Sequence, residues 1–428
     1  MADAKRSAAD SRRDFLQKSS VLAGAAVVGS LAVPRSVHAA QSETLRIGLV
    51  GCGGRGSGAA VNAMKADDNC KLVALADAFP DQVEECRKRL QQAGGTKFDV
   101  TPDRCFSGFD AYQKLIDCGV DVVLLATPPH FRPEHFRACV EAGKHVFVEK
   151  PVAVDAPGVR SVMETNKLAR EKNLAVVSGL CWRYDHGVRE TIGRIHDGAI
   201  GDVVAIQSNY NAGTLWHRGD NPDWSRMEYQ MRNWLYYTWL SGDHNVEQHI
   251  HSLDKTTWLL GDIAPERATG LGGRQQRTAD KWGHIFDHHA VVYEYPGGVR
   301  VFAYCRQQDG CSNDVDEYVM GTKGQAIVLK NVIDGESRWR YRGSKPNMYD
   351  VEHEELFASI RSGQPINNGD YMARSTMIAI MGRMCTYTGQ TLSWDECLNS
   401  AERLGPVEYA WTDVPEPEVA IPGRTQFA

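Results

Sequence analysis

Apolar residues between positions 45 and 179 come in short unbroken runs separated by longer amphipathic stretches. The runs are rich in Val, Ile and Leu and hardly alternate with polar residues, which is typical of strands buried on both faces of a parallel sheet. They are LRIGLV (45–50), KLVALA (71–76), VDVVLLA (120–126), KHVFVE (144–149) and LAVVSG (174–179). Helical patterns over Asp81–Gln92, Pro133–Ala142 and Ala156–Lys172 lie between them. Strands and helices that alternate at this spacing predict a doubly wound α/β domain of the Rossmann type over residues 43–183.

The pattern changes in the second half, where apolar and polar residues alternate as in strands with one solvent-facing side. The strand candidates are GDVVAIQSNY (201–210), HAVVYEYPGGVRVFAYCR (289–306, two strands around a Pro-Gly-Gly turn) and DEYVMGTKGQAIVL (316–329, a strand, a turn and a strand). Helical patterns return at Glu354–Arg361 and Met372–Tyr387. We therefore predict an α+β C-terminal domain over residues 184–412, with a large, mainly antiparallel open sheet. A proline-rich tail, residues 413–428, is expected to be extended.

The first 40 residues have the layout of a secretory signal. Arg12 and Arg13 lie in SRRDFLQK, and a mild apolar run from Val21 to Val33 is followed by the small-residue stretch SVHAA. This order of regions is that of a cleaved signal, and the S-R-R-x-F-L-x-K form is similar to a twin-arginine signal, whose pathway carries folded cargo. The apolar run is too short to span a bilayer. We expect residues 1–40 to be removed and the protein to be periplasmic or otherwise exported.

Composition and charge exclude some partners. A chain of 428 residues is long enough for two domains, and 42% hydrophobic and 24% charged residues are ordinary for a globular protein. The net charge of −6 gives no reason to expect nucleic acid, or a membrane after signal removal, as a partner. The 11 cysteines are scattered singly between Cys52 and Cys397 without a CxxC pair. This agrees with a chain that folds in the reducing cytoplasm and keeps buried thiols.

A glycine-rich loop, GLVGCGGRG, follows the first predicted strand and has the form G-x-G-x-x-G. Glycines there allow a tight turn, the approach of the backbone to a pyrophosphate and close packing of the next helix. The loop residues of the predicted cofactor site are Gly51, Gly53, Gly54, Arg55 and Gly56. Asp77 ends the second strand, where an acid can accept hydrogen bonds from the adenosine ribose. Because Ala78 and Phe79 follow, with no arginine to neutralise a 2′-phosphate, the sequence favours NAD over NADP.

The stretch ATPPHFRPEHFRACVEAGKHVFVEKPVA, residues 126–153, resembles the core of the Gfo/Idh/MocA oxidoreductases. The resemblance extends over nearly the whole mature chain, including ELFASIRSGQPINNGDYMARSTMIAIMGRM (355–384). It implies that a Thr-Pro segment and a Glu-Lys-Pro element border the nicotinamide, and that Lys150 contacts the reacting hydroxyl. A positive charge at that place lowers the barrier to alkoxide formation. The residues that this adds to the cofactor site are Thr127, Pro128, His130, Glu149 and Lys150.

The segment SGDHNVEQHIHSLD (241–254) is similar to that family's D-x-G-x-H-x-x-D pattern. The resemblance places His251 at the catalytic histidine, Asp254 at the closing acid and Glu247 where the family has aspartate. Glu247 and His251 are four residues apart, so we expect them on one helical face. The carboxylate would then raise the pKa of the imidazole and orient it as the base that takes the hydroxyl proton.

Two other interpretations of this segment remain open. His244, Glu247 and His251 share a helical face, and zinc accepts such ligands, but the H-E-x-x-H spacing is absent and no metal site is predicted. The histidines could also be satisfied core residues of a helix. General-base catalysis by His251 is the favoured interpretation.

Aromatic and planar polar side chains gather between residues 209 and 239. They are Tyr210, Asn211, Trp216, Arg218, Trp224, Tyr229, Arg232, Asn233, Trp234, Tyr236, Tyr237 and Trp239. Any one of them could be a core or interface residue, but as a set they favour a carbohydrate pocket, because aromatic faces stack on sugar C–H groups. The residues assigned to the substrate are Tyr210, Arg232, Trp234 and Asp254. The triplet Asp287, His288 and His289 is a weaker candidate for the same pocket.

These observations predict an NAD-dependent oxidoreductase that acts on a secondary hydroxyl of a sugar, polyol or glycoside. Folded export would let a tightly held dinucleotide travel inside the protein, and a captive cofactor must be reoxidised in place. A second sugar could do this, as in similar exported glucose–fructose oxidoreductases. Transient oxidation with loss of a glycosidic substituent, or an external electron acceptor, are the alternatives. A non-catalytic protein that holds NAD is the alternative from another class. The resemblance also implies a homo-oligomer that uses the open sheet face.

Overall fold

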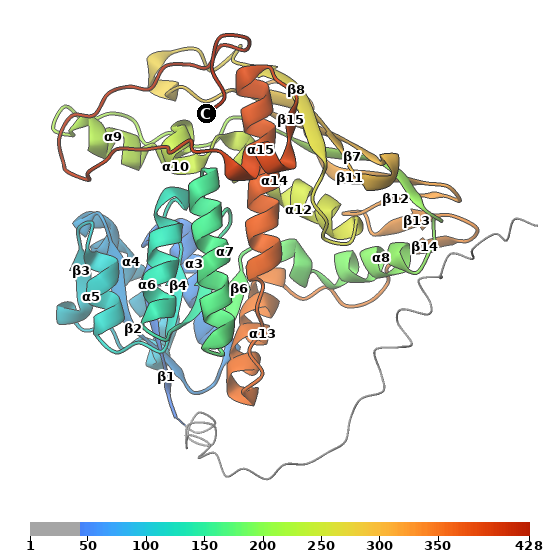
Figure 1. The fold of residues 1–428 in the computed structure, drawn as a ribbon. Helices are drawn as coiled ribbons and strands as arrows, with labels where there is room; N and C mark the ends of the chain where they lie inside the picture. The colour runs from blue at the N-terminus through green and yellow to red at the C-terminus, as the bar shows by residue number, and fades with distance from the viewer. Residues whose placement is uncertain (1–42) are drawn as a thin grey trace, which may run out of the picture. The chain divides into compact units, whose positions relative to one another are not determined.

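The structure is a computed structural model and describes residues 43–428 (Figure 1). The predicted twin-arginine signal lies outside the described residues. Within them the chain forms two sheets, a six-stranded sheet near the N-terminus and a nine-stranded sheet built from the later residues. The structure therefore confirms a Rossmann-type domain followed by a domain with a large open sheet.

The first sheet is parallel throughout, in the order β3-β2-β1-β4-β5-β6. Its strands are β1 Leu45–Val50, β2 Cys70–Asp77, β3 Cys105–Ser107, β4 Val122–Leu125, β5 His145–Val148 and β6 Val176–Ser178. Five of them coincide with the predicted apolar runs. The sequence pattern missed β3 because this strand has only three residues, none of them fully buried.

Five helices connect these strands, and their ends follow local sequence signals. They are α3 Gly54–Ala66, α4 Pro80–Gly94, α5 Ala111–Asp117, α6 Arg132–Glu141 and α7 Ala156–Glu171. Pro133 lies in the first turn of α6, where its missing N–H costs nothing. Gly143, with φ of 72°, follows the end of that helix. Asp155 caps α7 by accepting a hydrogen bond from the Gly158 amide at 2.8 Å.

A late helix completes the N-terminal domain. The helix α13, Met348–Ser362, packs on α3, and its Leu356 and Phe357 are fully buried with strand residues such as Ile47 and Leu49. The two faces of the parallel sheet are therefore covered by α3, α4 and α13 on one side and by α5, α6 and α7 on the other. The face under α3 depends on residues about 300 positions later in the chain.

The second sheet is mainly antiparallel, as predicted, in the order β14-β13-β12-β11-β7-β10-β9-β8-β15. Its strands are β7 Val203–Ala212, β8 Arg267–Gly273, β9 His288–Glu294, β10 Arg300–Gln307, β11 Asp314–Gly321, β12 Gln325–Ile327, β13 Val332–Asp334, β14 Arg338–Arg340 and β15 Leu392–Ser393. The pairing of β7 with β10 is parallel, and the other pairings are antiparallel.

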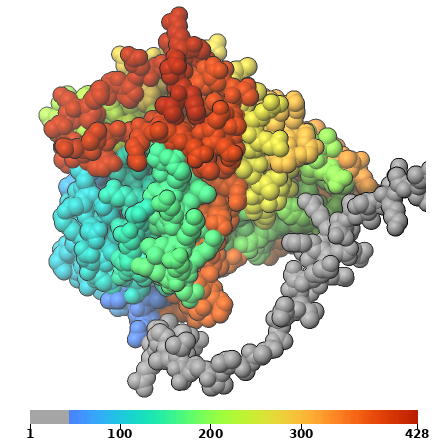
Figure 2. Space-filling model, in the orientation of Figure 1, coloured from blue at the N-terminus to red at the C-terminus, as the bar shows by residue number. Residues whose placement is uncertain are grey.

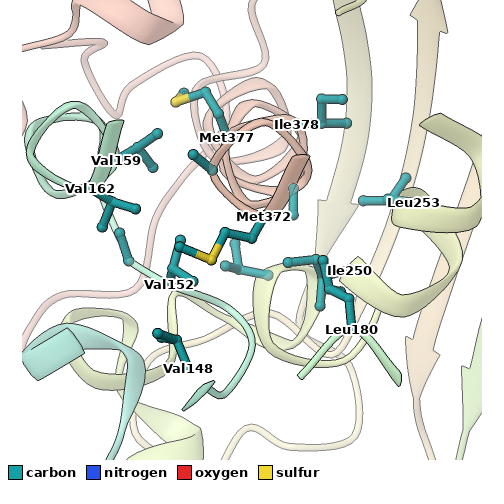
Figure 3. Close-up of a cluster of buried hydrophobic side chains, with 14 of the residues drawn as sticks. Val148, Val152, Val159, Val162, Leu180, Ile250, Leu253, Met372, Met377 and Ile378 are labelled. Carbon is teal, nitrogen blue, oxygen red and sulfur yellow. The ribbon is translucent and has the colours of Figure 1, made fainter. Parts of the chain in front are cut away.

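The remaining helices pack around this sheet and against the first domain. They are α8 His186–His196, α9 Arg226–Arg232, α10 Thr238–Ser241, α11 His244–Glu247, α12 Ile250–Leu259, α14 Gly369–Thr388 and α15 Trp394–Asn399. The helix α14 is buried on nearly every side, because it lies between α7, α12 and β8. Figure 3 shows the cluster that joins these helices, including Val159 of α7, Leu253 of α12 and Met377 of α14.

The described residues contain neither a membrane-spanning helix nor a disulfide bond. None of the helices in residues 43–428 is both long and apolar enough to cross a membrane. All eleven cysteines are free thiols, and eight of them are buried. In the space-filling view the C-terminal residues, in red, lie over the cyan and green elements of the N-terminal half (Figure 2).

Candidate active site

The glycine loop between β1 and α3 leaves open space beside its backbone. Gly51 has φ of +100°, and a Cβ there would lie 2.5 Å from the carbonyl carbon of Ala126. A Cβ on Gly56 would lie 1.9 Å from the Gly51 oxygen, so both positions require glycine. A Cβ on Gly53 or Gly54 would meet nothing within 4 Å. No side chain caps the N-terminus of α3, so its first amides remain available to an anion. The loop therefore fits a dinucleotide pyrophosphate.

Asp77 is fixed beside this loop by the backbone. Its Oδ2 accepts a hydrogen bond from the Cys52 amide at 2.7 Å, and its Oδ1 accepts one from the Phe79 amide at 3.0 Å. Burial raises the pKa of Asp77, while the two amides act in the opposite direction. The carboxylate lines the cavity described next, at the place where an acid contacts an adenosine ribose in this type of fold.

A cavity of about 470 Å³ lies over the glycine loop and Asp77, a size typical of ligand sites. Eight of the eleven residues predicted to bind the cofactor line it. They are Gly51, Gly53, Gly54, Arg55, Gly56, Asp77, Thr127 and Pro128. The other three, His130, Glu149 and Lys150, do not line it. The structure thus brings together the phosphate loop, the acid at the end of β2 and the Thr-Pro segment after β4.

Glu149 is connected to the cavity through Arg55. The Arg55 guanidinium lines the cavity, donates to Glu149 and lies 3.3 Å from an oxygen of Glu352. Glu149 also accepts a hydrogen bond from the Lys150 amide at 3.2 Å. Although burial acts to raise it, the pKa of Glu149 is lowered by the charges of Arg55 and Arg132. Arg55 thus ties the glycine loop to the Glu-Lys-Pro element.

His130 contacts aromatic residues outside the lining of the cavity. Its Nε2 lies 2.7 Å from the hydroxyl of Tyr409, and its ring lies edge-on to Trp239 with centroids 5.1 Å apart. Burial lowers the pKa of His130 to about 4. The structure thus places His130 outside the lining of the cavity, in contact with Tyr409 near the C-terminus.

Lys150, Glu247 and Tyr210 belong to one connected polar group. The Lys150 ammonium donates to the carbonyl oxygen of Glu247 at 2.6 Å and to its Oε1 at 2.8 Å. The other carboxylate oxygen of Glu247 accepts a hydrogen bond from Gln248, whose amide oxygen accepts one from the Tyr210 hydroxyl at 2.7 Å. The two charged side chains are about nine-tenths buried. Lys150 is therefore held rigidly, with Tyr210 linked to it through two side chains.

His251 and Glu247 do not share one continuous helical face. The helix breaks at Gln248 and His249, so Glu247 ends α11 while His251 lies in the first turn of α12. The carboxylate of Glu247 is directed to Lys150 and Gln248. The predicted contact between the Glu247 carboxylate and the His251 imidazole is therefore replaced by contacts with Lys150 and Gln248.

The electrostatic environment of His251 is also the reverse of the prediction. Burial, followed by the charges of Lys150, Lys255 and Arg55, lowers the pKa of His251 well below its usual value. Its Nδ1 is buried and makes no hydrogen bond with the described residues. The imidazole is therefore neutral at physiological pH, and it is a weaker base than an exposed histidine.

Two residues assigned to the sugar lie at the same cavity as the glycine loop. Trp234 and Arg232 both line that cavity. The Arg232 guanidinium donates to both oxygens of Asp81 on α4, at 2.9 and 3.0 Å, and lies 4.1 Å from the centre of the Phe79 ring. The ion pair with Asp81 holds the Arg232 guanidinium just after β2, next to Phe79 and Asp77.

Asp254 is committed to a structural ion pair. Its carboxylate accepts hydrogen bonds from the Arg183 guanidinium, at 2.9 to 3.1 Å, and from the Ser375 hydroxyl at 2.8 Å. The side chain is only 1% exposed, so a substrate cannot reach it in this conformation. The predicted substrate contact by Asp254 is therefore corrected to a role within the core.

The triplet of residues 287–289 supports the loop before it rather than a pocket. Asp287 accepts hydrogen bonds from three consecutive amides, Gln275 to Arg277, and from the His288 imidazole. His289 is buried, with its Nε2 3.0 Å from Asp243. All three side chains of the triplet thus make hydrogen bonds within the protein.

The alternative metal ligands are not assembled. Across residues 43–428 no three His, Cys, Asp or Glu side chains are grouped closely enough to hold a metal ion. Glu247 is occupied by Lys150, and His244 is buried edge-on to Tyr210 with ring centroids 5.9 Å apart.

The sequence analysis missed two residues of the site. Gln248 connects Tyr210 to Glu247 and lies within the segment SGDHNVEQHIHSLD, so its place next to Glu247 in the sequence indicates that it belongs to the site. Glu352, the second carboxylate near Arg55, comes from α13. No local pattern connects α13 to the glycine loop.

Comparisons with known proteins agree with this architecture. The family model described as the Gfo/Idh/MocA oxidoreductase family, NAD-binding Rossmann fold, matches residues 45–180, and the model of the Gfo/Idh/MocA C-terminal domain matches residues 188–327. Together they match more than half of the chain.

Similar curated proteins are enzymes of several kinds. The chain is 27% identical over 255 residues to a 2,7-anhydro-N-acetylneuraminate hydratase of Escherichia coli K12, an alignment that covers 59% of each chain. The alignment thus spans about three fifths of that relative's length. It is 25% identical over 337 residues to an inositol 2-dehydrogenase/D-chiro-inositol 3-dehydrogenase of Halalkalibacterium halodurans, covering 75% of this chain and 85% of the relative.

The fold is also that of solved structures. A scyllo-inositol dehydrogenase from Lactobacillus casei with bound NAD(H) and scyllo-inositol superposes with a TM-score of 0.64 at 20% identity. The superposition covers 82% of this chain and all of the other. Two matching family models, the shared two-domain architecture and the phosphate loop with its Glu-Lys-Pro element lead to one conclusion. The chain belongs to the Gfo/Idh/MocA family of oxidoreductases, whose N-terminal domain is an NAD-binding Rossmann fold.

Proposed function

We propose that this protein is an NAD-dependent oxidoreductase that acts on a secondary hydroxyl of a sugar, polyol or glycoside and holds its cofactor tightly. The observation that carries the proposal is the Lys150 ammonium, fixed by two oxygens of Glu247 at the carboxyl edge of the parallel sheet. The preceding residue, Glu149, connects it to the dinucleotide cavity through Arg55. A fixed cation beside such a cavity is placed to stabilise an alkoxide. The inositol dehydrogenases among the relatives support the substrate class.

The residues that would hold the cofactor are the glycine loop, Asp77 and the Thr-Pro segment. The open amides of α3 suit the pyrophosphate, and the Asp77 carboxylate suits the hydroxyls of the adenosine ribose. When bound, NAD supplies a hydride acceptor. We favour NAD over NADP because the nearby Arg232 guanidinium is already paired with Asp81 and Glu228. A 2′-phosphate would therefore meet the Asp77 carboxylate, and Arg232 would have to leave its two carboxylate partners to neutralise it.

Lys150 and His251 would share the transfer of the hydroxyl proton. The Lys150 ammonium donates a hydrogen bond to the substrate oxygen and stabilises its negative charge as the hydroxyl is oxidised. His251, neutral because its pKa is lowered, accepts the proton. The hydrogen bonds from Tyr210 through Gln248 to Glu247 keep the lysine in place.

The acid limb of the kcat/KM profile is expected well below pH 6.5. His251 accepts a proton only when neutral, and its lowered pKa keeps it neutral as the pH falls through the ordinary histidine value of about 6.5. The measurement is kcat/KM between about pH 5 and 9 for the wild type and for His288→Asn, a half-buried histidine outside the site. A limb centred near 6.5 in both proteins would contradict a base whose pKa is lowered.

The function itself is tested by the nucleotide that the purified mature chain carries. We expect about one NAD per chain after denaturation, and a rise in the near-ultraviolet band of reduced nicotinamide when a suitable sugar or polyol is added to the native protein. Asp77→Ala should lower the NAD content, whereas Asp99→Ala, an exposed acid on the same domain, should not. A chain that neither carries nor takes up NAD would rule out the proposal. Bound NAD that no sugar, polyol or glycoside reduces would favour the non-catalytic NAD-holding protein.

A second candidate is a reaction in which the hydroxyl is oxidised only transiently. A substituent would then be eliminated or water added, and the hydride and proton returned, so that no net redox change occurs. The hydratase among the relatives supports this alternative. It differs from the first candidate in its product, which would have the oxidation state of the substrate while the bound NAD stays oxidised.

Two further proposals concern location and assembly. We propose export by the twin-arginine pathway, on the evidence of SRRDFLQK alone, and cell fractionation tests it. We also propose that a second copy covers the open face of the larger sheet, where Val204, Tyr304 and Met320 are exposed on neighbouring strands. The mass of the mature chain in solution tests this assembly.

A further inference from the structure

Two segments far apart in sequence run side by side near the adenosine end of the cavity. They are the helix α9 and the segment Tyr409–Glu416, and we call them together the clasp. Their contacts are Met227 N to Thr412 O at 3.2 Å, Arg226 N to Asp413 Oδ1 at 3.1 Å, Gln230 Nε2 to Pro415 O at 3.3 Å and Arg226 Nε to Glu416 Oε1 at 2.9 Å. These bonds fasten the C-terminal segment along α9. In Figure 1 the late red chain passes beside α9.

The clasp is attached to the N-terminal domain by an ion pair and by aromatic contacts. Arg232, the last residue of α9, makes two hydrogen bonds to Asp81 at the start of α4. The ring of Trp411 stacks on Phe109 with centroids 4.6 Å apart and lies 5.2 Å from Phe79. These contacts join two domains around one edge of the Rossmann sheet.

Tyr409 adds a third attachment. Its hydroxyl lies 2.7 Å from Nε2 of His130, and its ring stacks on Phe109 at 5.5 Å. His130 follows the Thr-Pro segment, so the clasp contacts the N-terminal domain after β2, after β3 and after β4. Two of these strands, β2 and β4, flank β1, whose glycine loop suits the pyrophosphate, and β3 lies next to β2 at the edge of the sheet.

The partners of the clasp are walls of the cavity itself. Phe79 and Phe109 line it together with Asp77, and so do Met231 and Arg232 of α9. Trp411 lies against both phenylalanines from outside the cavity lining. A molecule with its adenosine next to Asp77 would therefore have the clasp as its outer wall.

We propose that the clasp retains the dinucleotide, so that NAD leaves only when Arg232 separates from Asp81 and Trp411 from the two phenylalanines. This inference rests on the proposed function, because it takes NAD as the ligand of the cavity. It gives the proposed tight binding a physical cause within a single chain. The proposal also assigns a function to residues 409–416, which do not contact Lys150 or the side chains that hold it.

The test is the rate at which bound NAD is released from the full mature chain. Protein loaded with NAD is diluted into a solution of an enzyme that consumes free NAD, so that released NAD cannot bind again. The NAD that remains on the protein is measured over time. We expect release to be at least tenfold faster in Trp411→Ala and in Arg232→Met. Val407→Ala, a fully exposed residue just before the clasp, is the matched control and should release NAD at the wild-type rate.

The outcomes separate this inference from the proposed function. Wild-type rates in both clasp variants, with NAD bound in all proteins, would overturn the clasp and leave the proposed function intact. A wild type that binds no NAD would overturn both. If Trp411→Ala does not fold, Arg232→Met and the salt dependence of NAD release provide the test. Salt screens the partly exposed ion pair between Arg232 and Asp81, so it should speed NAD release from the wild type but not from Arg232→Met. Equal salt dependence of release in Arg232→Met and wild type would contradict the role of the pair.

Discussion

Replacing Lys150 by alanine is expected to lower kcat about 10³-fold, because it removes the cation that stabilises the developing alkoxide. The loss should fall on kcat more than on NAD content, since Lys150 does not line the dinucleotide cavity. Glu247→Gln keeps an oxygen acceptor for Lys150 but removes the charge that pairs with it. Its loss should be smaller, about 10-fold. Turnover is measured with the substrate that reduces the bound NAD.

The matched control for this variant is Lys114→Ala, an exposed lysine that pairs with Asp110 on the surface of the same domain. Its kcat should stay within about twofold of the wild type, because surface ion pairs contribute little. If Lys150→Ala turned over at a similar rate while retaining NAD, the catalytic assignment would be wrong. The non-catalytic NAD-holding alternative would then be preferred.

Asp254→Asn is expected to lower the free energy of unfolding by about 3–5 kcal/mol, because it leaves the buried Arg183 guanidinium without its main partner. Asp254 accepts four hydrogen bonds in the core, three from Arg183 and one from Ser375. Loss of its charge leaves the guanidinium neutralised only by the partly exposed Asp262, so much of the desolvation penalty of Arg183 is uncompensated. Chemical denaturation of the mature chain measures the change.

Asp262→Asn provides the comparison, since Asp262 binds the same guanidinium but is about one-third exposed. Asparagine tolerates the left-handed backbone at this position, where φ is 57°. The loss should be about 1 kcal/mol, as for partly exposed pairs. A stable Asp254→Asn protein with a raised KM would instead restore the substrate contact that the motif implied.

The dinucleotide site could be predicted from the sequence because its parts are next to the strands that position them. The glycine loop follows β1, Asp77 ends β2 and Thr127 begins the turn after β4. Parallel strands place their carboxyl ends at one edge of the sheet, so the order of elements is enough to gather these residues. Lys150 follows β5 and reaches the same edge for the same reason. The strands of the second sheet were predictable where the alternation was regular, as in β7 and β9.

The placement of the later side chains depended on partners distant in sequence. Arg232 and Trp234 have the residue types of a sugar pocket, and the structure places them at the cavity over the glycine loop, where Asp81 on α4 binds Arg232. Asp254 lies in the core and not in the predicted pocket, because Arg183, 71 residues earlier in the chain, pairs with its carboxylate there.

The sequence alone determined the Rossmann domain, its phosphate loop, the acid at the end of β2 and the lysine after β5, because short-range patterning and strand order suffice for them. Only the tertiary structure decided which charges meet. It turned the Glu247 carboxylate from His251 to Lys150, lowered the pKa of His251 instead of raising it, and laid the C-terminal segment over the adenosine end. The physical reason is that burial and ion pairing depend on the distance between side chains in space, which local sequence patterns do not contain.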